Sequence, residues 1–154
     1  MDHLREHLVD QLMGEYAHIG FDRAVEDIDT KYLGKRPDSL PYSIWELAEH
    51  IRIAQNDILK FCVDPDYESP DWPKGYWPEE QAPSHKTEWE QTLEAISDDR
   101  LSMVNLVKDP DIDLFEPFSH GEGQTLFREA VLIIDHTSYH TGQIVTARRL
   151  LGIW

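Results

Sequence analysis

The sequence predicts an all-α protein, a four-helix bundle whose helices run up, down, down and up. Four stretches carry apolar residues at the three- and four-residue spacing of amphipathic helices. No stretch shows the alternating pattern of a β-strand. A long stretch rich in proline and aromatic residues separates the second pattern from the third, where a crossover would let both helices run in the same direction. Because 154 residues is the size of one domain, we expect residues 1–154 to form a single bundle.

The first helix is predicted over residues 2–17. Its apolar residues share one face and are Leu4, Leu8, Leu12 and Tyr16. Gly14 and Gly20 leave the end of this helix open, because glycine often terminates helices. A second, short helical piece is expected over residues 21–28. A loop that contains Gly34, Pro37 and Pro41 follows it.

The second long helix is predicted over residues 43–61. Ser43 and Glu46 form the capping-box pattern that marks a helix start. The apolar stripe consists of Leu47, Ile51, Ala54 and Ile58. His50 lies beside this stripe and therefore faces the interior or its edge, either as a hydrogen-bonded core residue or as a metal ligand.

Residues 63–83 follow neither a helical nor a strand period. They contain five prolines together with Trp72, Tyr76 and Trp77. A segment with so many aromatic residues is not a typical flexible linker. About 20 extended residues can run the length of a helix of roughly 30 Å. We therefore expect a crossover that packs against the bundle through its aromatic side chains, and a lid over a site is the alternative.

The last two helices are predicted over residues 84–108 and 125–151. Asp109 and Pro110 end the first of them, and Thr125 caps the second. The apolar positions of the third helix are Trp89, Leu93, Ile96, Met103 and Leu106. Those of the fourth are Leu126, Ala130, Ile133, Ile144, Ala147 and Leu151.

Composition narrows the classes of function. The net charge of −16 disfavours binding to nucleic acid and to anionic membrane surfaces, because both are themselves negative. The single cysteine, Cys62, excludes an internal disulfide. No apolar run reaches the length of a membrane span, and the charged N-terminus lacks the apolar core of a signal peptide. These features predict a cytoplasmic protein.

His136 and His140 stand four residues apart in the last predicted helix. This spacing places both imidazoles on one face, where they can bind one transition metal. In a bundle of the predicted topology, His50 lies at the same level of the facing helix, so that three imidazoles can meet and leave a fourth position open. Thr137 stands where the metalloprotease motif His-Glu-x-x-His has its glutamate, so a base must come from elsewhere.

The chain resembles the DinB-like superfamily of metal-binding four-helix bundles. The resemblance rests on residues 43–50, on residues 135–145 with the following 148–152, on Tyr76-Trp77-Pro78 and on residues 120–125. It implies a divalent metal, zinc or nickel, held by His50, His136 and His140. It also implies a homodimer. Relatives include metal-dependent hydrolases and S-transferases that use a low-molecular-weight thiol.

Two functional hypotheses follow. The first is a metal-dependent enzyme, a hydrolase or a thiol S-transferase acting on a small molecule. The second is a non-catalytic bundle in which the metal, or a hydrogen-bonded histidine cluster, only braces the core. Ligation requires neutral imidazoles, so metal affinity is expected to fall below about pH 6.

Several polar residues near the predicted site have more than one interpretation. Glu46 is a candidate base, outer-shell acceptor or fourth ligand, besides its capping role. Gln143, one turn after His140, is a candidate hydrogen-bonding partner of a substrate or of a ligand, or a polar residue between helices. Asp135 points away from His136 around the helix. His18 and His120 either line the mouth of the site or are solvated loop residues.

Overall fold

The computed structural model describes residues 2–14 and 17–154. Its α-helices are α1 (Asp2–Leu12), α2 (Phe21–Val25), α3 (Ile44–Val63), α4 (Lys86–Lys108) and α5 (Leu126–Leu150), and short 3₁₀ helices cover Thr30–Tyr32 and Lys74–Tyr76. No β-strand occurs in these two ranges, so the predicted all-α class is confirmed. Among the helices placed here, none is both long enough and apolar enough to cross a membrane.

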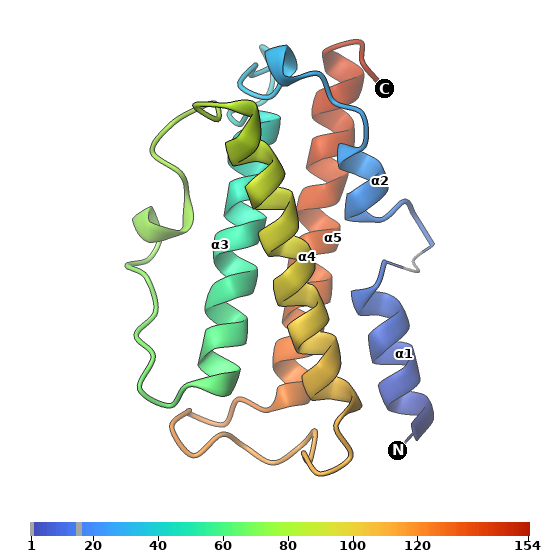
Figure 1. The fold of residues 1–154 in the computed structure, drawn as a ribbon, viewed down its shortest axis with the longest axis vertical. Coiled ribbons are helices and arrows are strands. Elements are labelled where there is room, and N and C mark those ends of the chain that lie inside the picture. Colours follow the sequence, from blue (N-terminus) through green and yellow to red (C-terminus); the bar gives the residue numbers. More distant parts are fainter. Residues whose placement is uncertain (1, 15–16) are drawn as a thin grey trace.

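The three long helices lie side by side along the long axis of the molecule (Figure 1). The crossover leaves one end of α3 and returns to the level of its other end, so α3 and α4 run in the same direction and α5 runs against them (Figure 1). The two short helices follow one another along the same axis, where α1 packs on α4 and α5, and α2 packs on α5. The centre of α3 therefore faces the centre of α5.

The bounds of the helices agree with the sequence prediction except near the N-terminus. The three long helices begin and end within two residues of the predicted positions. The first helix was predicted to residue 17 but ends at Leu12, and Gly14 follows with a φ of 89°, a left-handed conformation that stops a helix. The predicted apolar residue Tyr16 lies outside the described residues. Helix α2 is three residues shorter than the predicted piece.

The start of α3 shows the predicted capping box. The Ser43 hydroxyl accepts a hydrogen bond from the Glu46 backbone N–H at 3.1 Å, and the Glu46 carboxylate accepts one from the Ser43 N–H at 2.8 Å. The Ser43 hydroxyl also donates to the carbonyl of Gln81 at 2.7 Å. One residue thus starts α3 and ties the end of the crossover to it.

Replacing Ser43 by alanine is expected to destabilise the protein by about 1–2 kcal/mol, because it removes the cap and this tie together. Chemical denaturation of both proteins measures the change. Ser102→Ala is the matched control, since among the described residues that exposed hydroxyl donates a hydrogen bond only to the carbonyl of Asp98, within its own helix. Equal losses in the two variants would contradict the capping role.

Two apolar clusters fill the bundle and are interrupted along α5. The first contains Phe21, Leu47, Ile51, Trp89 and Ile144, and the second contains Leu12, Ile58, Met103, Leu126 and Ile133. Between Ile133 and Ile144, the buried residues of α5 are His140 and Thr141. Burying polar groups costs free energy unless they are satisfied. This interruption of the core is therefore the first structural sign of a site.

Candidate metal centre

Three histidines meet in the middle of the bundle, at the interruption between the apolar clusters. His50 comes from α3, and His136 and His140 come from successive turns of α5. One ring nitrogen from each lies within 4.8 Å of the other two. The Nε2 atoms of His50 and His136 are 3.0 Å apart. The structure thus brings together the three residues that the sequence predicted to meet.

Burial keeps these imidazoles neutral. His50 and His140 are buried, and His136 is half-buried. Burial, together with the neighbouring His140 and His50, lowers the pKa of His136 to about 3. Burial also lowers the pKa of His50 and of His140, against the opposing effect of a hydrogen bond that each ring makes. Neutral imidazole is the form that binds a metal.

Two of the rings are held by hydrogen bonds on the side away from the cluster. The Nδ1 of His50 lies 2.7 Å from the carbonyl of Tyr76, and the Nδ1 of His140 lies 2.6 Å from the Oε1 of Gln143. Both oxygens can only accept, so each Nδ1 carries the proton. The Nε2 of each of these two rings is then unprotonated and directs its lone pair into the cluster, as in metal sites whose outer-shell partners fix the tautomer.

The cluster fits a divalent transition metal. Two imidazole nitrogens that bind one zinc ion at tetrahedral angles lie about 3.3 Å apart. The separation of 3.0 Å between the Nε2 atoms of His50 and His136 is close to this value. With three neutral rings, two of them held in a fixed tautomer, the histidines could hold one such ion. They are also the only group of this kind found among the described residues.

The crossover closes one side of the cluster. The Trp77 ring stacks on His50 at a centroid distance of 4.0 Å and on Tyr42 at 4.4 Å, so the indole lies between them. The Tyr76 hydroxyl donates to the Oδ2 of Asp57 on α3 at 2.7 Å. Burial, with Asp57, raises the pKa of Tyr76 to about 12, so the hydroxyl remains a donor. The predicted packing of the crossover is confirmed for Tyr76 and Trp77, whereas Trp72 is 77 % exposed.

Comparison with protein families is consistent with this geometry. The family model described as the DinB superfamily matches residues 18–144, which include all three histidines. The chain belongs to the DinB superfamily. Searches of curated proteins and of solved structures gave no match. Membership in the DinB superfamily supports a metal site at these histidines, while the reaction has to be inferred from the site.

Glu46 does not join the cluster. Its carboxylate accepts hydrogen bonds from the Ser43 N–H and from the Arg36 guanidinium, which approaches both oxygens. Burial alone would raise the pKa of this carboxyl, but Arg36 and Ser43 outweigh it and hold the pKa below its usual value. The capping role is confirmed, and a role as base or ligand stays a prediction.

The other polar candidates are distributed around the bundle. Gln143 contacts a candidate ligand, His140, and a contact with substrate stays a prediction. Asp135 is exposed. His18 is exposed, and its Nε2 lies 2.9 Å from the Ser138 hydroxyl on α5. The Nε2 of His120 donates a hydrogen bond to the carbonyl of Phe61. Because Phe61 lies about 16 Å along α3 from His50, His120 does not line the site.

The sequence did not predict which crossover residues contact the candidate metal ligands. The Tyr76 carbonyl and the Trp77 ring lie in a segment without periodicity, so their register against α3 could not be predicted. The one available signal was the Tyr76-Trp77-Pro78 segment that carried part of the family resemblance. The pairing of Arg36 with Glu46 was also missed, because Arg36 lies in an irregular loop.

Replacing Gln143 by alanine is expected to weaken zinc binding about 10- to 100-fold, because His140 loses the acceptor that fixes its tautomer. Competition with a chromophoric chelator measures the affinity. Gln143→Glu should restore it, since a carboxylate accepts the same hydrogen bond. An unchanged affinity in Gln143→Ala would show that the hydrogen bond does not orient the ligand.

Proposed function

We propose that the protein is a divalent-metal-dependent enzyme of the hydrolase or thiol S-transferase type, with His50, His136 and His140 as the metal ligands. The observation that carries the proposal is an incomplete ligand set. Within the part of the chain that the structure describes, no carboxylate or thiol joins the three imidazoles. Structural zinc sites have four protein ligands, whereas three histidines leave a position for a substrate.

The residues of the chain have separate tasks in this proposal. The Tyr76 carbonyl and the Gln143 side chain orient His50 and His140, and Trp77 shields His50 from solvent on one side. When bound, a zinc or nickel ion supplies Lewis-acid chemistry that polarises a substrate and favours the deprotonated form of water or of a thiol.

A thiol used in such a reaction comes from outside the protein. Burial raises the pKa of the Cys62 thiol to about 12, so Cys62 is not a thiolate near neutral pH. Cys62 also lies outside the histidine group. A transferase activity therefore requires a low-molecular-weight thiol as co-substrate.

The second candidate function is a non-catalytic metal-binding bundle. One observation favours it: pockets of about 530, 480 and 410 Å³ are lined by residues other than the three histidines. In this alternative the ion joins α3 to α5 and replaces apolar packing at the interruption of the core. The two candidates differ in whether a substrate reaches the ion.

Three further expectations belong to this proposal. We take α1 and α2 together as the first member of a four-helix bundle with the up-down-down-up order. Family resemblance supports a homodimer formed through helix faces. The composition supports a location in the cytoplasm, with no nucleic acid or membrane as a partner.

Activity of the metal-loaded protein tests the proposal. Protein purified without a histidine tag, loaded with zinc or nickel, is assayed on nitrophenyl esters and amides, and on aromatic electrophiles with small thiols. We expect turnover that His136→Ala loses and that His7→Ala, in an exposed histidine of α1, retains. Stoichiometric metal without turnover on any substrate of either class would favour the non-catalytic bundle.

A further inference from the structure

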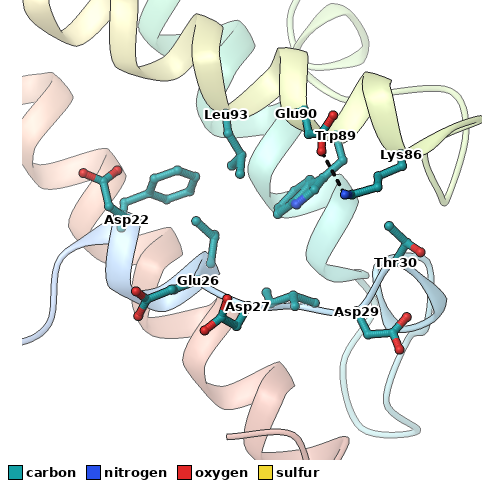
Figure 2. Close-up of a pocket in the computed structure, with 12 residues that line it drawn as sticks. Asp22, Glu26, Asp27, Asp29, Thr30, Lys86, Trp89, Glu90 and Leu93 are labelled. Carbon is teal, nitrogen blue, oxygen red and sulfur yellow. Dashed lines mark ion pairs between the residues drawn. The ribbon is translucent and has the colours of Figure 1, made fainter.

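The candidate metal centre is largely covered. The exposed fractions of His50 and His140 are 4 % and 7 %, and His136 is half-buried. A pocket of about 530 Å³ is lined by α2, the turn after it and the first turns of α4, and it shares no residue with the centre (Figure 2). Access of a small molecule to the centre is therefore expected to depend on the elements that cover the histidines.

The crossover covers His50 with a segment that has few contacts to the bundle. This segment, residues 65–79, runs along the outer side of α3 (Figure 1), and we call it the strap. None of its residues is buried. Its backbone hydrogen bonds are formed within the strap and with Asp64, the residue just before it. Segments with few buried contacts open at a lower free energy than the core does.

The interactions of the strap with α3 gather at two residues, Asp57 and His50. The Tyr76 hydroxyl donates a hydrogen bond to Asp57 at 2.7 Å, and Tyr67 lies beside the same carboxylate. The Tyr76 carbonyl accepts a hydrogen bond from the Nδ1 of His50 at 2.7 Å, and the Trp77 ring stacks on the imidazole. One of the two points that hold the strap on α3 is therefore a candidate metal ligand.

The residues that follow the strap are fixed to the start of α3. The Glu80 carbonyl accepts a hydrogen bond from the Trp45 indole N–H at 3.1 Å, and the Gln81 carbonyl accepts one from the Ser43 hydroxyl at 2.7 Å. Both donor residues, Trp45 and Ser43, are buried. The strap can therefore leave α3 while the chain on either side of it keeps its place.

We propose that the strap opens and closes over the metal centre and that a bound divalent ion holds it closed. An ion on the Nε2 of His50 withdraws electron density from the ring, so that Nδ1–H becomes a stronger donor to the Tyr76 carbonyl. Because coupling between two equilibria is reciprocal, closure of the strap and binding of the ion favour each other by the same factor. The inference rests on the metal site of the proposed function and not on a reaction.

Limited proteolysis of the full-length protein with trypsin, at a temperature well below unfolding, measures the opening. Lys74 is the only lysine or arginine of the strap, and cleavage after it requires Tyr76 and Trp77 to leave α3 and enter the protease. The rate of this cleavage follows the population of the open state. We expect zinc to slow cleavage after Lys74 at least about fivefold. Cleavage after Lys31, an exposed residue of the loop between α2 and α3, should stay nearly unchanged.

Tyr76→Phe supplies the matched variant, because it removes the hydrogen bond to Asp57 and keeps the backbone carbonyl that contacts His50. Without metal, we expect this variant to be cleaved after Lys74 about three- to tenfold faster than the wild type. Tyr42→Phe is the control, since it keeps the ring that stacks on Trp77 and removes a hydroxyl that makes no hydrogen bond among the described residues. It should be cleaved as the wild type is.

Three results would overturn the proposal. They are cleavage after Lys74 that zinc does not slow, equal slowing after Lys74 and Lys31, or equal rates for Tyr76→Phe and Tyr42→Phe. Equal slowing at both sites would mean that zinc stabilises the whole protein or inhibits the protease. Because cleavage and not turnover is measured, the proposal can fail for a protein that is an active enzyme, and it can hold for one that is not.

Discussion

Zinc or nickel added to the metal-free protein is expected to raise its melting temperature by about 8–16 °C. An ion that binds only the folded state at about 1,000 times its Kd stabilises that state by about 4 kcal/mol. For a domain of this size, each kcal/mol corresponds to roughly 2–4 °C. Thermal unfolding with and without a chelator measures the shift.

The histidine variants separate a specific site from general binding of metal to an acidic protein. His136→Ala should lose nearly the whole shift, because two imidazoles hold the ion far more weakly than three. His7→Ala should keep it, since His7 is an exposed residue of α1. A shift of equal size in all three proteins would assign the binding to surface carboxylates.

The metal-free protein is expected to lose stability on acidification in a window set by the histidines. The pKa of His136 is about 3 in the folded state, below its ordinary value of 6.5. Between these values the unfolded chain binds a proton that the folded protein does not, so stability falls as the pH falls through this window. His136 alone should contribute about 2 kcal/mol between pH 7 and pH 5, and His50 and His140 act in the same direction.

Urea unfolding at pH 7 and at pH 5, in the presence of a chelator, measures this loss in the wild type and in His136→Asn. The variant lacks a titrating group at that position, so its stability should change less between the two pH values. Equal changes in both proteins would show that His136 ionises alike in the folded and unfolded states.

The lowered pKa values also correct an expectation drawn from the sequence. A free histidine has a pKa near 6.5 and is mostly protonated below about pH 6, which led to the prediction that metal affinity falls below that value. Burial lowers the pKa of all three candidate ligands, so protons compete with the metal only at lower pH. The decline in affinity is therefore expected to begin at a lower pH than the sequence alone predicted, with acid unfolding as the competing process.

The parts of the fold with helical periodicity could be predicted from the sequence. The starts of α3 and α5 followed from a capping serine and threonine, because these signals are local. The proximity of His50 to His136 and His140 could be predicted because all three lie near the middle of their predicted helices. The first helix was overextended, because the apolar position at Tyr16 continued the pattern beyond the glycine that stops it.

The contacts that irregular segments make with the helices could not be predicted. The Tyr76 carbonyl and the Trp77 ring reach His50 from a segment whose path depends on packing. Arg36 reaches Glu46 from a loop, and this contact bears directly on the candidate role of Glu46 as a base.

Metal content is the most direct test of the central claim, that His50, His136 and His140 together bind one divalent ion. Elemental analysis compares the wild type with His136→Ala, both purified without a histidine tag and reconstituted in the same way. We expect about one equivalent of zinc or nickel in the wild type and less than about a tenth in the variant. Equal metal content in both proteins, or none in the reconstituted wild type, would contradict the claim.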